Sequence, residues 1–477
     1  MLSPWKTPNA EQSVQQAAFF QQDDLISVIT TQPIERALDY RAPEGGCFDG
    51  AYVEVPLGPR KVLGVVWGAG QGGYDAAKIR PVLRVLDVAP MTPEMKLFLQ
   101  RAADYTVTPF SAMLRLATRA PGLSGPPSMR KIYYPGNIEA IKKTKARERV
   151  LDVFDTYDGA GFTLKELAGL AGVSTSVIKG MLPSGAVVEK ATPRDRPFAR
   201  LNPDKAGKKL TTAQSAATDR LDALIKQDAY STALLRGVTG SGKTEVYLEA
   251  VAQTLRQGQQ ALVLLPEIAL TGEFLQRVES RFGVRPAEWH SGVTMTERRR
   301  IWKMVGQGQA ELVVGARSAL FLPFRSLGLI VVDEEHDSSY KQQDGVRYHA
   351  RDMAVLRASI AGAKVVLASA TPSLESWTNA GAGKYHRIDL TDRFGPSVLP
   401  TIETIDMRLE NLPSNRWISD TLAAQVKTRL GRSEQVLLFL NRRGYAPITL
   451  CRACGTQIGC TQCDARMVEH RFLNRLV

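Results

Sequence analysis

The sequence predicts a multidomain protein whose largest part is an α/β domain of the P-loop type. Between residues 205 and 395, short apolar segments such as ALVLLP, ELVVGA, LGLIVVDE and AKVVLASA alternate with helical patterns. This alternation is typical of a parallel sheet with helices on both faces. A glycine-rich loop, GVTGSGKT, stands between the strand-like segment STALLR and a helical pattern. A β-rich domain and a winged helix are expected ahead of this part of the chain.

Length and composition limit the number of domains and the class of protein. The 477 residues suffice for roughly three or four domains, and 44% hydrophobic residues argue against wholesale disorder. The net charge of +13 favours a polyanionic partner, although soluble basic proteins without nucleic acid share such a charge. Neither a signal-peptide pattern nor an apolar run long enough to span a membrane occurs. We therefore expect a cytoplasmic protein with no membrane partner.

The N-terminal third divides into a tail and two small domains. Residues 1–22 form a polar, Gln-rich tail, and residues 23–118 contain the β-branched runs LISVITTQ, AYVEVPL and KVLGVVWG. Within residues 130–200, apolar positions at helical spacing on either side of Gly172, followed by GAVVEK, indicate a helix-turn-helix with a wing. The alternative for this last segment is any small helical domain.

The glycine-rich loop has the residues that bind nucleotide phosphates. Gly237, Gly240 and Gly242 allow backbone N–H groups to wrap the phosphates of ATP. Lys243 is expected to reach the β- and γ-phosphates and to act in catalysis, and Thr244 to ligate Mg²⁺. The helix that follows adds a favourable dipole at its N-terminus.

Three further motifs accompany this loop in the order expected of a nucleotide-driven motor. The buried segment LIVVDEEH ends in Asp333, a candidate Mg²⁺ ligand, and Glu334, a candidate catalytic base that polarises water. The tripeptide SAT at 369–371 closes another buried strand, where a polar tip can relay the nucleotide state. Gln214, upstream in LTTAQ, is a candidate for reading adenine; the alternative is a surface helix residue.

This series of motifs resembles the PriA family of bacterial replication-restart helicases. The likeness rests on LTTAQ, GVTGSGKTEVY, LLPEIALT, HSG, GARSALFLPF, DEEHDSSYKQQDGVRYHARD, SATPSLES and LFLNRRGYAP, and covers about residues 25–477. It implies a RecA-like helicase lobe at 205–395, a second lobe beginning at 396, and superfamily 2 DNA unwinding from 3′ to 5′. It also implies ATP, Mg²⁺ and Zn²⁺ as cofactors, and forked and single-stranded DNA, primosome proteins and single-strand-binding protein as partners.

The resemblance assigns DNA-binding residues in two places. In the β-rich domain, Asp39, Tyr40 and Gly58 fall in the region that captures the leading-strand 3′ end, although Leu38 stands where the family usually has an aromatic residue. The second place is an aromatic-rich loop that couples DNA to ATP hydrolysis, with the residues Tyr340, Lys341, Arg347 and Tyr348. Interleaved aromatics and cations suit single-strand binding, and the alternative for these four is ordinary packing under the sheet edge.

Four cysteines gather in the segment CRACGTQIGCTQC, as the pairs Cys451/Cys454 and Cys460/Cys463. CxxC pairs suit zinc, and the alternative is structural cysteines. Only five residues separate the pairs, whereas a single four-cysteine site usually has a much longer spacer. The spacing therefore indicates two half-sites, and the resemblance implies two zinc ions held by four such pairs.

The sequence stops at Val477, where the resemblance implies that further CxxC pairs and the rest of a second lobe, with its arginine finger, would follow. We therefore expect a C-terminally truncated chain with an incomplete second lobe at 396–477. The first functional hypothesis is an ATP-dependent DNA helicase. The second is a module that binds forked DNA and ATP without unwinding. A third, another superfamily 2 translocase of the restriction type, would need a nuclease motif, and none is found.

Overall fold

The computed structural model describes most of the chain, and two compact units divide it, Met1–Gly395 and Pro396–Val477. The described residues are 18–72, 78–118, 129–137, 144–157, 159–193, 195–266, 272–390, 401–410, 412–413, 416, 418–439, 454, 456, 469–470 and 475–476. Most of the expected tail, residues 1–17, lies outside them. Within these ranges no helix has the length and apolarity needed to cross a membrane.

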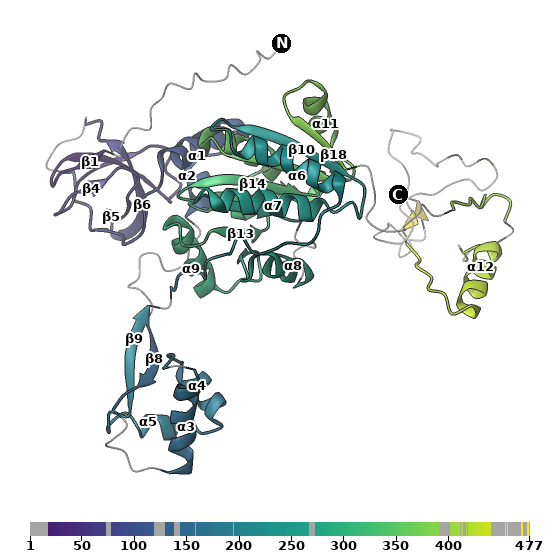
Figure 1. Cartoon of the computed structure of the whole chain (residues 1–477). Coiled ribbons are helices and arrows are strands. Elements are labelled where there is room, and N and C mark those ends of the chain that lie inside the picture. Colours follow the sequence, from purple (N-terminus) through teal and green to yellow (C-terminus); the bar gives the residue numbers. More distant parts are fainter. Residues whose placement is uncertain are drawn as a thin grey trace. The chain divides into compact units, whose positions relative to one another are not determined.

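A seven-stranded sheet forms the centre of the first unit (Figure 1), and its neighbouring strands all pair in parallel. Its strands, in spatial order, are β12 (Ala287–Trp289), β13 (Leu312–Gly315), β11 (Gln260–Leu264), β14 (Leu327–Asp333), β17 (Lys364–Ser369), β10 (Ser231–Gly237) and β18 (His386–Leu390). The α/β fold class predicted from the alternating segments is confirmed.

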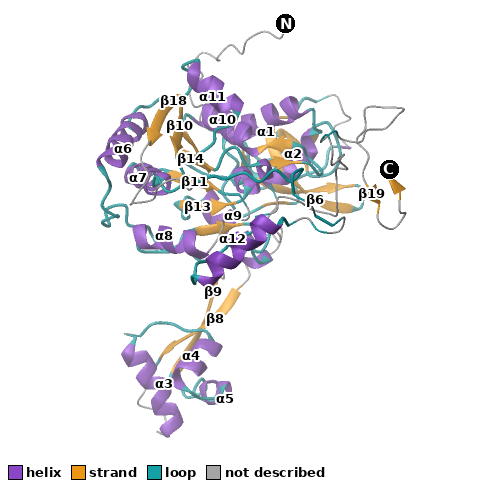
Figure 2. Ribbon diagram, turned by 90° about the vertical axis from the view of Figure 1, so that its right-hand side faces the viewer, coloured by secondary structure: helices purple, strands orange, loops and turns teal. Residues whose placement is uncertain are grey.

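Helices cover both faces of this sheet, as Figure 2 shows. They are α6 (Thr212–Ile225), α7 (Lys243–Arg256), α8 (Gly272–Phe282), α9 (Met295–Gly306), α10 (Ala350–Ala361) and α11 (Leu374–Gly381). Alternate residues of each strand enter opposite cores, as the pleat requires. In β14, Leu329 and Val331 pack in one core while Ile330 and Val332 pack in the other. This double burial explains why the strands read as unbroken apolar runs.

The front of the chain forms a five-stranded antiparallel sheet in the order β3-β2-β6-β5-β7, with a small β1-β4 ladder beside it. The bounds are β1 (Phe19–Phe20), β2 (Leu25–Thr30), β3 (Leu38–Arg41), β4 (Cys47–Phe48), β5 (Tyr52–Leu57), β6 (Arg60–Ala69) and β7 (Arg84–Val85). The β-rich prediction for this region is thereby confirmed, with one omission: it ends in two helices.

These two helices are α1 (Pro93–Thr106) and α2 (Phe110–Ala117). The start of α1 follows from its sequence, because the Thr92 hydroxyl accepts the backbone N–H of Met95 and Pro93 occupies the first helical position. The sequence prediction did not include these helices, because it was based on the β-branched runs that lie upstream of them.

The front domain and the seven-stranded sheet share one hydrophobic core. The Tyr52 ring packs edge-on against Trp302, with 5.1 Å between ring centroids, and Trp302 Nε1 donates to the carbonyl of Ala117 at 2.7 Å. Arg357, buried on α10, donates to the carbonyls of Leu320 and Leu322 and lies over the ring of Phe98 on α1. The shared core therefore packs the front domain directly against the seven-stranded sheet.

A third domain contains α3 (Lys145–Thr156), α4 (Leu164–Ala171) and α5 (Thr175–Lys179), with the antiparallel pair β8 (Met129–Pro135) and β9 (Val187–Pro193). A capping box between Thr163 and Glu166 starts α4, and Gly172 ends it with φ 59°. These helices and strands are the parts of a winged helix, with β9 as the wing strand.

Short elements at the sheet edge complete the first unit: η4 (Arg317–Phe321), η5 (Ser338–Tyr340), β15 (Lys341–Gln342) and β16 (Tyr348–His349). Described residues of the second unit include α12 (Asp420–Gly431) and the two-residue strands β19 (Glu469–His470) and β20 (Arg475–Leu476).

The strand expected to begin the second unit, in EQVLLFLNRRGYAP, is not found where the structure describes this segment. Residues 434–439 have no regular structure, and Leu437 and Phe439 are 89% and 83% exposed. The prediction was wrong for these residues because an apolar strand needs neighbouring strands to bury it. In the described part of the second unit, the strands are only the short β19 and β20. Residues 440–450 of the segment lie outside the described residues.

Candidate nucleotide site and nucleic-acid interface

The phosphate-binding loop connects the carboxyl end of β10 to the first residue of α7 (Figure 1). A Cβ at Gly237 would lie 2.4 Å from Ser241 Oγ, so this hydroxyl would have to shift, and Gly240 and Gly242 have φ of 80° and 83°. Within the described residues, Ser241 Oγ is buried without a hydrogen-bond partner. A buried hydroxyl left in this way suits a loop that closes on a polar ligand.

Lys243 and Gln214 both bond to the backbone of this loop. Lys243 is 8% exposed, and its Nζ donates to the carbonyl of Gly237 at 2.9 Å. Gln214 is 5% exposed; its Nε2 donates to the carbonyl of Ser241 at 2.9 Å, and its Oε1 accepts the backbone N–H of Thr211. The structure thus places the proposed adenine-reading amide against the loop, where it supports the loop's shape.

The two candidate catalytic carboxylates lie at the end of β14. Tyr247, fully buried on α7, donates its hydroxyl to Asp333 Oδ2 at 2.9 Å and follows Thr244 by three positions on the same helix. This bond joins the Asp333 carboxylate to the helix that carries Thr244, the other predicted Mg²⁺ ligand. Burial raises the pKa of the Asp333 carboxyl, and the hydrogen bond from Tyr247 acts against that rise. Two oxygen ligands beside a phosphate-binding loop fit the preference of Mg²⁺.

Glu334 has an unusual backbone. Its φ is 47°, in the left-handed region that costs a residue other than glycine about 1–3 kcal/mol. Its N–H donates to Asp333 Oδ1 at 3.0 Å, and its side chain is 40% exposed. The surrounding contacts hold the strained residue with its carboxylate accessible, as a general base requires.

The SAT motif contacts the same edge. Ser369, the last residue of β17, is fully buried, and its Oγ lies 2.8 Å from His336 Nδ1. It also accepts the backbone N–H of Thr371 at 3.0 Å. The acidic motif and SAT are thus joined directly.

In the aromatic-rich loop, the two tyrosines are buried and the two cations are exposed. Tyr340 is 1% exposed, and its hydroxyl donates to the carbonyls of Asp333 at 2.6 Å and Leu264 at 3.0 Å. Tyr348 is 4% exposed and packs edge-on against Phe321. Lys341 and Arg347 are exposed. In this conformation the two cations are open to a DNA backbone, whereas both tyrosine rings are packed inside.

In the front domain, two of the three expected DNA-binding residues, Asp39 and Tyr40, lie on β3, and Gly58 lies in the turn between β5 and β6. Asp39 on β3 accepts backbone N–H groups of Gln71 and Gly72, at 3.3 and 2.9 Å. The hydroxyl of Tyr40 donates to the carbonyl of Pro56 at 3.0 Å, and the residue is 5% exposed. Gly58 has φ 58° and open space where a side chain would be. Asp39 and Tyr40 therefore also stabilise the domain itself.

The cysteine cluster is barely described. Cys451, Cys460 and Cys463 lie outside the described residues, and Cys454 Sγ bonds Thr456 Oγ1 at 3.2 Å. The predicted zinc sites therefore remain a prediction.

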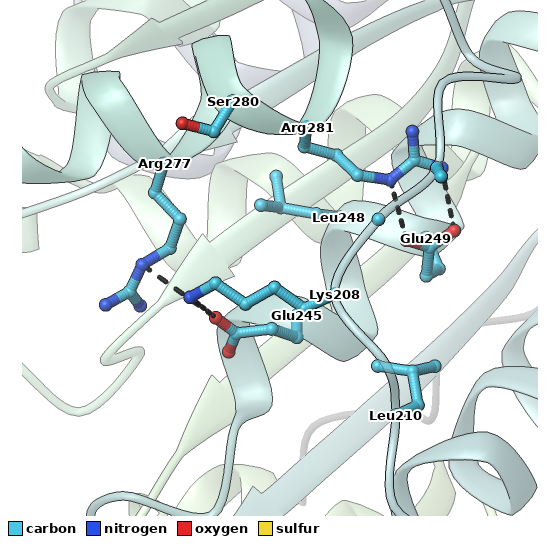
Figure 3. A pocket seen from close by; sticks show the side chains of 10 residues that line it. Lys208, Leu210, Glu245, Leu248, Glu249, Arg277, Ser280 and Arg281 are labelled. Carbon is cyan, nitrogen blue, oxygen red and sulfur yellow. Dashed lines mark hydrogen bonds and ion pairs between the residues drawn. The ribbon is translucent and has the colours of Figure 1, made fainter.

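A hollow of about 180 Å³ lies next to the phosphate-binding loop, between residues 206–210, α7 and α8 (Figure 3). Glu245, which follows Thr244, pairs there with Lys208 at 3.2 Å and with Arg277 at 3.9 Å. None of the predicted nucleotide-binding residues lines this hollow. These ion pairs link the first turn of α7 to residues 206–210 and to α8.

The sequence prediction did not include four residues near the site, namely Tyr247, Glu335, Arg351 and Ser373. Tyr247 stands three positions after Thr244, a spacing that puts both on one helix face. Glu335 was visible as a third acidic residue directly after a buried strand. Nothing in the sequence marks Arg351 or Ser373 as its partners.

The sequence of this chain is similar to those of known helicases. The family described as DEAD/DEAH box helicase matches residues 211–379, and the PriA-type 3′DNA-binding domain (3′BD) matches residues 27–119. Replication restart protein PriA of Bacillus subtilis is 31% identical over 95% of this chain and 66% of its own length. The protein of the same name from Haemophilus influenzae is 35% identical over 95% and 63%. That of Rickettsia typhi is 49% identical over 53% and 39%. The chain thus spans less than two thirds of the length of these relatives.

Proposed function

This chain belongs to the family of the replication restart protein PriA, and on that premise we propose that it works as an ATP-dependent DNA helicase in replication restart at stalled forks. The single observation that supports this most is the bond from the buried Tyr247 hydroxyl to Asp333, which joins the end of β14 to the helix that follows the phosphate-binding loop and carries Thr244. The strained Glu334 directly follows Asp333. A nucleotide site built in this way, in a domain that shares its core with a 3′DNA-binding domain, suits a motor on DNA.

Each residue of the nucleotide site has its own role in binding or hydrolysing ATP. Lys243 exchanges its bond to the Gly237 carbonyl for the β- and γ-phosphates, while the loop N–H groups hold the phosphate oxygens. Thr244 and Asp333 hold Mg²⁺, which neutralises charge on the phosphates when bound. Glu334 polarises the attacking water. Gln214 keeps the loop closed and, once the loop moves on ATP binding, its amide is free to read adenine.

In this proposal, the chain binds DNA at two places. Asp39, Tyr40 and Gly58 belong to the surface that receives a 3′ end, and Lys341 and Arg347 contact the backbone of a single strand. Tyr340 and Tyr348 join that contact only if the loop opens, because both rings are buried in the structure. Movement from 3′ to 5′, recognition of forks, and partnership with primosome proteins and single-strand-binding protein complete the proposal.

Zinc binding by Cys451, Cys454, Cys460 and Cys463 is part of the proposal, and it is supported by the chemistry of the thiolates. Metal analysis of the purified chain by mass spectrometry tests it, with the four cysteines replaced by serine as the control. Zinc at the same level in the control chain would overturn this assignment.

The deciding experiment measures ATP turnover and fork unwinding by the wild-type chain and by Glu334→Gln. We expect the wild-type rate to rise with single-stranded and forked DNA, and Glu334→Gln to bind ATP and DNA normally while turnover falls by about 10²-fold or more. Wild-type turnover in the variant would refute the role of Glu334. ATP and fork binding with no turnover in the wild type would favour the alternative, a binding module without unwinding activity.

A further inference from the structure

Glu335, the third residue of the DEEH motif, has no part in the chemistry above, yet it is fully buried. Its carboxylate accepts four hydrogen bonds. Oε1 accepts the backbone N–H of Ser373 at 2.7 Å. Oε2 accepts the hydroxyls of Ser373 at 3.0 Å and Ser376 at 2.9 Å, and Arg351 Nη1 at 3.2 Å. A buried carboxylate that is paired and fully hydrogen-bonded avoids the large cost of desolvation.

These partners come from two separate elements. Ser373 is the N-cap of α11, so the carboxylate also lies at the positive end of that helix. Arg351 is the second residue of α10, which begins immediately after β16. Since β15 and β16 are the two strands of the aromatic-rich loop, Arg351 lies directly after the base of the loop that carries Lys341 and Arg347.

On its other side, Glu335 adjoins the candidate catalytic base. Glu334 has φ 47°, and both of its neighbours in the chain are held. The carbonyl of Asp333 accepts the Tyr340 hydroxyl, and the N–H of Glu335 donates to Ala368 at 3.1 Å. The bonds of the Glu335 side chain thus help to keep the backbone of Glu334 in its strained conformation.

We propose that Glu335 is a positioning residue that links the exposed DNA-facing loop, through Arg351, to the catalytic Glu334. When DNA shifts the loop, α10 carries Arg351 with it, and the shared carboxylate transmits the shift to Glu334 and to the start of α11. This inference rests on the proposed function, since it concerns how DNA raises ATP turnover. Coupling between two sites in a protein typically changes the response by roughly 5- to 150-fold.

The test measures ATP turnover against DNA concentration for the full 477-residue chain and for Glu335→Gln. We expect the maximal stimulation by single-stranded DNA to fall by about fivefold or more. The half-saturating DNA concentration should stay as in the wild type, and the DNA-free rate should change less than the stimulated one. A structural role would lower both rates together.

Glu249→Gln is the matched control, because Glu249 forms a part-buried ion pair in the same unit, with Arg281 at 2.7 and 2.8 Å. It should lose stability yet keep the ratio of stimulated to DNA-free turnover. Equal loss of that ratio in both variants would overturn the proposal.

Should Glu335→Gln fail to fold, Ser376→Ala removes a single hydrogen bond and decides the matter. A partial loss of stimulation supports the link, and full stimulation overturns it. A wild-type chain that hydrolyses ATP without any response to DNA would instead refute the proposed function.

Discussion

Replacing Lys243 by alanine should remove ATP-driven work and leave DNA binding intact. In the structure the Lys243 ammonium is buried and donates to the Gly237 carbonyl at 2.9 Å. With nucleotide bound, the same group serves the phosphates. A hydrogen bond with a charged partner contributes about 1.5–3 kcal/mol, so ATP affinity should fall by roughly 10- to 150-fold.

The same substitution has a modest cost for folding. Gly237 is buried, so its carbonyl loses its donor in the variant, at a cost of about 1–3 kcal/mol. The exposed cations Lys341 and Arg347, which we propose contact DNA, lie on a different segment and are unchanged in the variant. Lys208→Ala is the control, because it removes the same charge from an exposed pair with Glu245, which contributes at most about 1 kcal/mol.

The assay combines nucleotide titration with fluorescence anisotropy on forked DNA for the wild type, Lys243→Ala and Lys208→Ala. We expect ATP binding to weaken only in Lys243→Ala, and fork affinity to stay similar in all three. A loss of fork affinity above about tenfold in Lys243→Ala, equal to 1.4 kcal/mol, would refute the division of labour between the loop and the DNA-binding surfaces.

Three other results are expected. Tyr247→Phe removes the donor to Asp333, so the Mg²⁺ concentration that half-saturates ATP turnover should rise about 10- to 100-fold; an unchanged Mg²⁺ titration would contradict this. Trp302→Ala empties the core shared by the front domain and the sheet, so urea unfolding should show a loss of about 3–5 kcal/mol, and a loss near zero would mean that the domains do not depend on this contact. DNA binding by a chain of net charge +13 should weaken steeply with salt, with log K falling by about 0.9 per phosphate contacted for each unit of log salt; a flat line would remove nucleic acid as the main partner.

The parts of the site that could be predicted from sequence are those fixed by local order. GVTGSGKT between a strand and a helix defines a loop whatever surrounds it, because its glycines dictate the backbone. The apolar run that ends in Asp333 likewise identifies a buried strand and the edge on which its last residue lies. The fold class followed from the same strands.

Side-chain partners could not be predicted, because they come from segments far apart in the chain. Glu335 and Ser373 are 38 residues apart, and Tyr247 and Asp333 are 86 apart. A single sequence shows no signal for such pairs. The strand predicted at 434–439 was wrong for a related reason. A strand-like composition does not show whether neighbouring strands are available to cover the segment.

The aromatic-rich loop shows how burial alters an assignment made from residue types. Aromatics and cations interleaved in sequence suggest one DNA-binding surface, yet in the structure both tyrosines are buried and both cations are exposed. The Tyr340 hydroxyl bonds the carbonyls at the ends of β14 and β11, so the loop is fastened to two neighbouring strands of the catalytic edge. Lys341 adjoins this anchor and remains exposed. In the proposed function, a DNA phosphate bound to Lys341 would act one residue away from the Tyr340 bond to Asp333, which would connect DNA contact to the proposed Mg²⁺ site without any base stacking.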